Sequence, residues 1–94
     1  MAGSIIITIP EDTIRLNIKT LLGTTKQVIC NKKETVAQLK EQIAFLMDID
    51  KENQTLLFNN LTLEDEKDLD SYGLKDGDSL KLIIGVGNYQ ILEG

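Results

Sequence analysis

The sequence predicts an α+β domain in which one helix covers a sheet of four or five strands. Apolar and polar residues alternate over residues 14–18 and again over residues 79–82, which is the period of a strand with one buried face. Between them, apolar residues of the segment 35–47 recur at helical spacing behind a capping motif. Each apolar row needs cover, and one amphipathic helix can supply it.

The first strand is expected from about Thr13, where Ile14, Leu16 and Ile18 form its buried row. Gly23 supplies the turn of a hairpin, and residues 26–30 form the return strand with Val28 and Cys30 on the buried side. Residues 1–12 precede this strand as an N-terminal extension, which contains the apolar run 5–9.

The helix is expected to begin at Thr35, because Thr35-Val36-Ala37-Gln38 matches a capping box. Val36, Leu39 and Ile43 form its buried stripe, and the helix should end near Met47. Three consecutive apolar residues, 45–47, cannot all face inward on a helix, so at least one should be exposed. Cover by Ile5–Ile9 or by Tyr89–Leu92 is one explanation, and a second partner surface or self-association is the other.

The second half of the chain contains short strands joined by turns. Residues 55–58 form a strand, Asn59-Asn60 form a turn, and residues 61–63 form a short extended piece. A short helical turn follows at 68–71. The last strand covers 79–84 with Leu80 and Leu82 inward, and Gly85-Val86-Gly87 is expected to break it. These bounds place the domain at 13–85 and a tail at 86–94.

The composition excludes several kinds of site. The chain has 94 residues, enough for one domain, and very few aromatic residues, so its core should consist of Ile, Leu and Val. It has no histidine, which excludes Ser-His-Asp and Cys-His catalysis and every histidine metal site. A single cysteine, Cys30, excludes an internal disulfide and fits a reducing compartment, so we expect a cytoplasmic or nuclear location.

The charge is unevenly distributed along the chain. Residues 64–78 carry seven acidic and two basic side chains, whereas residues 14–40 carry six basic and one acidic. The net charge of −5 argues against nucleic acid as a partner. No apolar segment approaches the ~20 residues of a membrane span, and Ile5–Ile9 is too short for a signal peptide, so no membrane partner is expected.

The acidic segment does not predict a metal or catalytic site. Asp68, Asp70 and Gly73 match three positions of a calcium-binding EF-hand loop, but Ser79 stands where the bidentate carboxylate is required. A solvated acidic surface explains the segment better. Asp76 and Asp78 flank Gly77, and a role in the turn explains them more simply than catalysis. We expect no cofactor.

Several short motifs in register resemble ubiquitin, without a gap from Ile14 to Ile84. They are Lys19-Thr20-Leu21-Leu22-Gly23, the capped helix, Leu56-Leu57-Phe58, Leu63-Glu64-Asp65, Ser71-Tyr72 and Ser79-Leu80-Lys81-Leu82. The resemblance implies a β-grasp fold with a mixed sheet, in which the first and last strands are parallel and central. It also implies that the hydroxyl of Tyr72 holds the preceding acidic loop, and that Lys40 is largely buried.

The end of the chain departs from ubiquitin. No Gly-Gly occurs, and Gly85-Val86-Gly87-Asn88-Tyr89 stands where ubiquitin has its basic conjugating tail. Thr55 and Gly85 replace the arginines that help ubiquitin dock its activating enzyme. We therefore expect a non-catalytic, monomeric domain that binds proteins, namely receptors or processing factors of the ubiquitin–proteasome pathway. The alternative is a divergent modifier conjugated through Gly87 after tail removal, or through Gly94.

Six residues are predicted to bind the partner. Leu57 and Ile83 alternate with inward residues and should point outward, and Leu21 lies at the hairpin tip. The resemblance brings these three together and adds a polar rim of Lys19, Asn60 and Lys81. An apolar cluster with a polar rim is typical of a protein-binding patch. The competing interpretation is that they are isolated surface residues, or that a terminal extension covers them.

Overall fold

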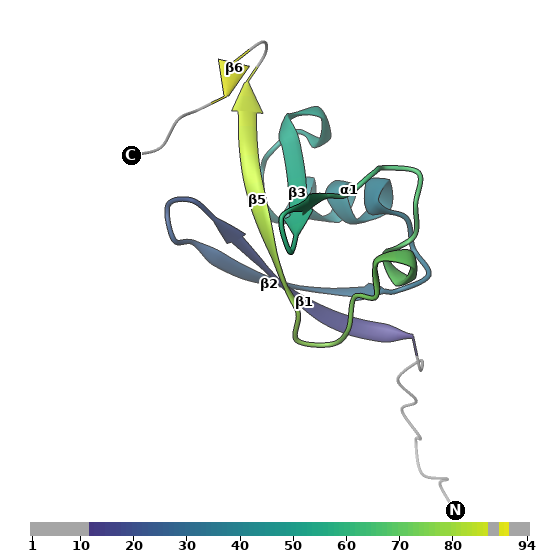
Figure 1. Ribbon diagram of the computed structural model, residues 1–94. Coiled ribbons are helices and arrows are strands. Elements are labelled where there is room, and N and C mark those ends of the chain that lie inside the picture. The colour runs from purple at the N-terminus through teal and green to yellow at the C-terminus, as the bar shows by residue number, and fades with distance from the viewer. Residues whose placement is uncertain (1–11, 87–88, 91–94) are drawn as a thin grey trace, which may run out of the picture.

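The structure is a computed structural model, and it describes residues 12–86 and 89–90 (Figure 1). The elements, in chain order, are β1 (Thr13–Thr20), β2 (Thr25–Asn31), α1 (Val36–Met47), η1 (Lys51–Asn53), β3 (Gln54–Phe58), β4 (Leu61–Thr62), η2 (Leu69–Tyr72), β5 (Ser79–Val86) and β6 (Tyr89–Gln90). None of the described helices is long and apolar enough to cross a membrane.

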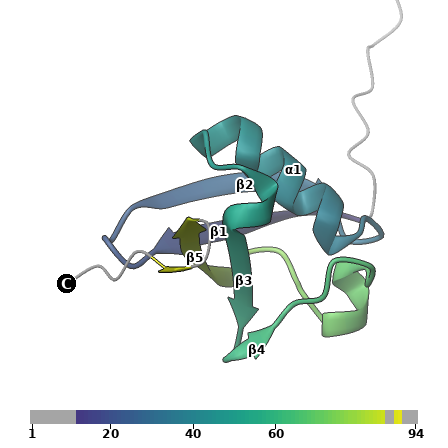
Figure 2. The same ribbon diagram turned by 90° about the horizontal axis from the view of Figure 1, so that it is seen from above.

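The main sheet has the strand order β2-β1-β5-β3-β4. β1 and β5 pair in parallel at its centre, and the other pairs are antiparallel (Figure 1). α1 crosses one side of this sheet (Figure 2). This is the sheet packed on one helix that the sequence predicts, and it is mixed, with the first and last long strands side by side, as the resemblance implies.

Successive side chains of each strand point to opposite faces of the sheet, so one row of side chains from each strand faces the helix. The β1–β2 register places Ile14 opposite Cys30 and Leu16 opposite Val28, so the two apolar rows share one face. Among residues 12–85, the buried apolar core consists of aliphatic residues and the one cysteine: Ile14, Leu16, Ile18, Val28, Cys30, Val36, Leu39, Ile43, Leu56, Leu63, Leu69, Leu74, Leu80 and Leu82. The expected core of Ile, Leu and Val is therefore confirmed.

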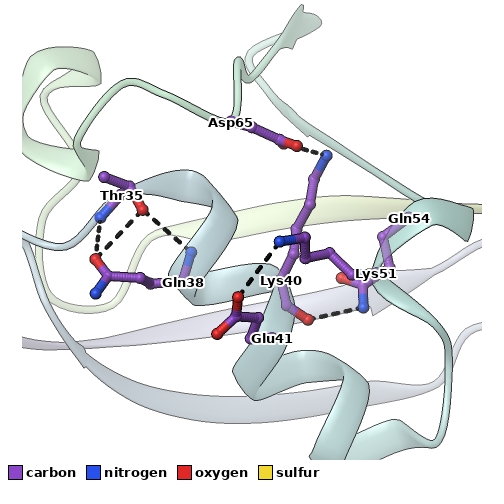
Figure 3. Close-up of polar contacts among 7 residues, drawn as sticks. All are labelled: Thr35, Gln38, Lys40, Glu41, Lys51, Gln54 and Asp65. Carbon is purple, nitrogen blue, oxygen red and sulfur yellow. Dashed lines mark hydrogen bonds and ion pairs between the residues drawn. The ribbon is translucent and has the colours of Figure 1, made fainter.

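The helix begins with the predicted capping box (Figure 3). The Gln38 N–H donates to the Thr35 hydroxyl oxygen at 3.2 Å, and the Thr35 N–H donates to Gln38 Oε1 at 2.9 Å. These bonds satisfy two backbone donors that have no partner inside the helix. The helix ends at Met47, and its C-cap residue, Asp48, has a left-handed φ of 58°.

Two buried polar residues connect the helix to the rest of the domain (Figure 3). The Lys40 ammonium pairs with Asp65 Oδ1 at 2.7 Å, which fastens the helix to the acidic loop. The Gln54 amide donates to the carbonyl oxygens of Lys40 and Ile49, both at 2.9 Å, and so fastens the helix end to β3. The expectation that Lys40 is largely buried is confirmed.

The turns of the second half follow their predicted chemistry. Asn59 and Asn60 both have positive φ and form the two-residue connection between β3 and β4. The Tyr72 hydroxyl accepts the Glu64 N–H at 2.8 Å, as the resemblance implies. Asp78 accepts the Lys75 N–H at 2.8 Å around Gly77, whose φ is +94°, so the predicted turn role is confirmed for Asp78. The Asp76 carboxylate accepts instead from Arg15 of β1.

The last strand is longer than predicted. β5 continues through Gly85 and Val86, where a break was expected, and pairs there with β6. The expected break is wrong because Gly85 pairs with Gln90 and Val86 with Tyr89, and this backbone pairing continues the strand where side-chain alternation ends.

Candidate protein-binding surface

The face of the sheet opposite α1 carries the predicted site. Three of its residues lie side by side across the central strands, because β1 pairs Lys19 with Lys81 of β5, and β5 pairs Lys81 with Leu57 of β3. We call these three residues the Lys–Lys–Leu row. Each alternates with buried neighbours such as Ile18 and Leu80, so their side chains leave the sheet on the side away from the helix.

A hollow of about 350 Å³ lies along this row. Its lining combines two lysines, an aliphatic wall and small polar residues: Lys19, Leu57, Asn59, Asn60, Ser79, Leu80 and Lys81. We call it the Leu57 hollow. It brings together four of the six predicted residues. Asn59 and Ser79 also line it and were not predicted, although the outward position of Ser79 beside inward Leu80 could be read from the alternation.

The remaining two predicted residues lie outside the lining of the hollow. Leu21 is 51% exposed and directly follows Thr20, which pairs with Leu82. Leu21 therefore lies in the turn that directly follows the β1–β5 pairing. Ile83 is half-buried and pairs with Thr55 of β3, and Leu57 is half-buried too. The aliphatic part of the surface is thus less exposed than alternation alone predicts.

A second hollow lies on the same face, nearer the sheet edge. It has a volume of about 610 Å³ and is lined by Thr13, Arg15, Ile29 and Asp76. The Arg15 guanidinium donates to both carboxylate oxygens of Asp76 at 3.1 and 3.2 Å, and the Arg15 backbone N–H adds a bond of 2.8 Å. These bonds lower the pKa of Asp76 and raise the pKa of Arg15. Ile29 is 60% exposed, and alternation with Val28 and Cys30 could have predicted this.

The end of α1 presents a third apolar area. Phe45 is 93% exposed and Leu46 45% exposed, whereas Met47 packs against the core. The prediction that at least one residue of this run is exposed is confirmed. The proposed covers Ile5–Ile9 and residues 91–92 lie outside the described residues. The backbone of residues 89–90 is described, and it pairs with β5.

The described residues bear on two kinds of chemical site, a metal site and a reactive thiol. Residues 12–86 and 89–90 contain no cluster of three or more histidine, cysteine, aspartate or glutamate side chains able to hold a metal ion. Burial, and to a smaller degree the nearby Glu34 carboxylate, raises the pKa of the Cys30 thiol to about 11. This thiol is therefore a poor nucleophile at neutral pH. Gly87 and Gly94, the candidate conjugation sites, lie outside the described residues.

Comparison with known proteins gives the family. The model of the ubiquitin family matches residues 16–86. AN1-type zinc finger protein 4 of Mus musculus is 36% identical over 75 residues, which cover 80% of this chain and 10% of that protein. The chain therefore spans about a tenth of the length of this curated relative. The C-terminal ubiquitin-like domain of human 2'-5'-oligoadenylate synthetase-like protein superposes with a TM-score of 0.76 at 27% identity, covering 89% of this chain and 99% of that domain. With this fold and these matches, the chain belongs to the ubiquitin family.

Proposed function

We propose that this chain is a non-catalytic ubiquitin-like domain that binds proteins of the ubiquitin–proteasome pathway, acting as a monomer in the cytoplasm or nucleus. The observation that supports the proposal is the Lys–Lys–Leu row beside its hollow. The row places a half-buried leucine next to polar and cationic side chains on a sheet face that the helix does not cover. This combination of an apolar centre and a polar rim is what protein interfaces need.

The pairing of residues 89–90 with β5 argues against one form of the competing function, a modifier conjugated through Gly94, and does not bear on conjugation through Gly87 after these residues are removed. At residues 89–90 the chain pairs back along β5, with Val86 opposite Tyr89, whereas a conjugating tail has to extend into the active site of another enzyme. The direct check is incubation with a cell extract and ATP. A covalent adduct formed through Gly87 or Gly94 would favour the modifier, and the absence of adducts is expected.

The binding proposal is tested with Leu57→Ala. Proteins retained from a cytosolic extract by the wild-type domain are identified, purified and titrated against the variant by calorimetry. If Leu57 is an interface anchor, its truncation should weaken binding by about 1–3 kcal/mol. Ile83→Ala and Leu21→Ala should weaken the same complexes.

Leu46→Ala is the matched control. Leu46 is a partly exposed leucine of α1, on the other side of the sheet, so its truncation should leave the affinity unchanged. Circular dichroism establishes that each variant is folded. Folded Leu57→Ala and Ile83→Ala domains that bind every partner as tightly as the wild type would refute the proposed surface.

A further inference from the structure

We infer that the Leu57 hollow binds an acidic side chain of the partner protein. The partner segment that docks there therefore presents a carboxylate and, next to it in the same segment, an aliphatic residue. The inference rests on the proposed function and specifies the chemistry of its partner. It follows from the placement of two lysines for which residues 12–86 provide no carboxylate partner.

The two lysines of the row are direct neighbours of like charge. Lys19 and Lys81 pair across β1 and β5, in strands about 4.8 Å apart, and both line the same hollow. Like charges at adjacent positions of a sheet repel, so this arrangement costs stability rather than adding to it. An anion from outside the chain would offset this repulsion.

Most other cations of the described chain already have a carboxylate within 4 Å. The paired cations are Arg15, Lys32, Lys33, Lys40, Lys51 and Lys67. Within residues 12–86, Lys19 and Lys81 make neither an ion pair nor a side-chain hydrogen bond. Lys26 and Lys75 also lack an ion pair there, but neither lines the Leu57 hollow. Within residues 12–86, Lys19 and Lys81 are therefore the two cations that line the same hollow and have no carboxylate partner.

The other groups around the hollow fit a carboxylate beside an apolar side chain. The Asn60 amide and the Ser79 hydroxyl can donate hydrogen bonds to carboxylate oxygens, and Leu57 supplies an apolar wall. A volume of about 350 Å³ is at the small end of ligand pockets, which suits one or two side chains of a docked segment. A neutral aliphatic partner would leave both ammonium groups without a counter-ion.

The charge of the whole molecule favours an acidic protein segment over a nucleic acid. The net charge is −5, and the segment 64–78 carries seven acidic side chains, so an extended polyanion would be repelled by much of the surface. The electrostatic part of the binding free energy of a carboxylate between two lysines depends mainly on charges within about one Debye length, which is ~10 Å at ordinary salt. A short acidic motif therefore gains the local attraction with little of the long-range repulsion.

The test selects displayed random peptides on the immobilised wild-type domain and on the double variant Lys19→Gln/Lys81→Gln. Wild type should enrich peptides in which Asp or Glu accompanies an aliphatic residue, and the double variant should lose the acidic preference. The strongest peptide is then synthesised with Glu or with Gln at its enriched acidic position. The Glu-to-Gln change should weaken binding to wild type about two- to tenfold and binding to the double variant much less. Among these complexes, added salt should weaken only the one between the Glu-containing peptide and the wild-type domain.

Lys26→Gln/Lys75→Gln removes the same charge away from the hollow and should keep the acidic preference. Lys19→Gln/Lys81→Gln should fold with equal or higher thermal stability, because it removes a repulsion. Selected peptides that need Leu57 but carry no acidic residue would overturn this inference and leave the proposed function standing. Peptides whose binding is insensitive to Leu57→Ala, or no selected peptides at all, would count against both.

Discussion

The individual residues with the most defined roles in this domain are its buried or partly buried polar groups. Lys40 and Gln54 are buried, and each meets specific oxygen atoms: a carboxylate of the acidic loop for Lys40, and two backbone carbonyl groups for Gln54. The Tyr72 ring packs against the core, and its hydroxyl accepts a hydrogen bond from the backbone of the acidic loop. A buried polar group without such partners would cost free energy, so these contacts determine where the surrounding loops can lie.

Tyr72→Phe tests one of these contacts in isolation. The change leaves the ring in place and removes the acceptor for the Glu64 N–H. We expect the free energy of unfolding to fall by about 0.5–1.5 kcal/mol, the usual net value of one hydrogen bond. Urea denaturation followed by circular dichroism measures it. An unchanged midpoint with an unchanged slope would mean that water replaces the hydroxyl at no cost.

Asp76 makes the stability depend on pH through its pairing with Arg15. The pair holds the pKa of the folded carboxyl below its usual value, so the unfolded chain binds more protons at acidic pH. The resulting stability is present above about pH 4 and is lost as the pH falls through the folded pKa. Asp76→Asn should therefore lower the melting temperature at neutral pH, and the difference from wild type should shrink toward pH ~2. A difference that stays constant across this range would contradict the ion-pair explanation.

At the scale of elements, local signals determined the boundaries where a motif was present. The capping box of Thr35 and Gln38 defines the start of α1, and the positive φ of Gly23 and of Asn59-Asn60 defines two turns. The end of the last strand, where the sequence offers no side-chain motif, was predicted wrongly. β5 extends through Gly85 and Val86 because the backbone of these residues pairs with β6. Such backbone pairing cannot be predicted from the alternation of apolar and polar side chains.

Thr35→Ala tests the start of the helix. The substitution removes the hydroxyl that accepts the Gln38 N–H, and the loss of an N-cap side chain costs about 1 kcal/mol. For a domain of this size that corresponds to a decrease of roughly 4–8 °C in melting temperature. Thr35→Ser retains the hydroxyl and should melt close to the wild type. Equal melting temperatures for Thr35→Ala and Thr35→Ser would show that the capping bond contributes nothing.

At the scale of the whole molecule, the sheet separates a core face from a face that the helix does not cover. Helix α1 covers the first, and the second carries the Lys–Lys–Leu row and both hollows. Cys30 lies on the core face and is buried, and the pKa of its thiol is raised to about 11. Its thiol therefore reports on the opening of the whole domain.

Thiol labelling measures that opening. At about pH 8 the native Cys30 should react with Ellman's reagent far more slowly than an unfolded thiol, whose pKa is ~8.5, because both burial and the scarcity of thiolate oppose the reaction. In denaturant the labelling should reach the rate of a free cysteine. Fast labelling of the native protein would contradict a closed core around Cys30.

The sequence by itself determined the class of the fold, the helix with its cap, the aliphatic core and the identity of the outward-facing residues. These depend on periodicity and on local turn chemistry, which involve residues close together in the chain. Only the tertiary structure decided which outward residues meet. The register of β1, β5 and β3 places Lys19, Lys81 and Leu57 in one row, leaves Leu21 and Ile83 outside its hollow, and joins Arg15 to Asp76. Pairing between strands depends on contacts between distant segments, and no local pattern specifies them.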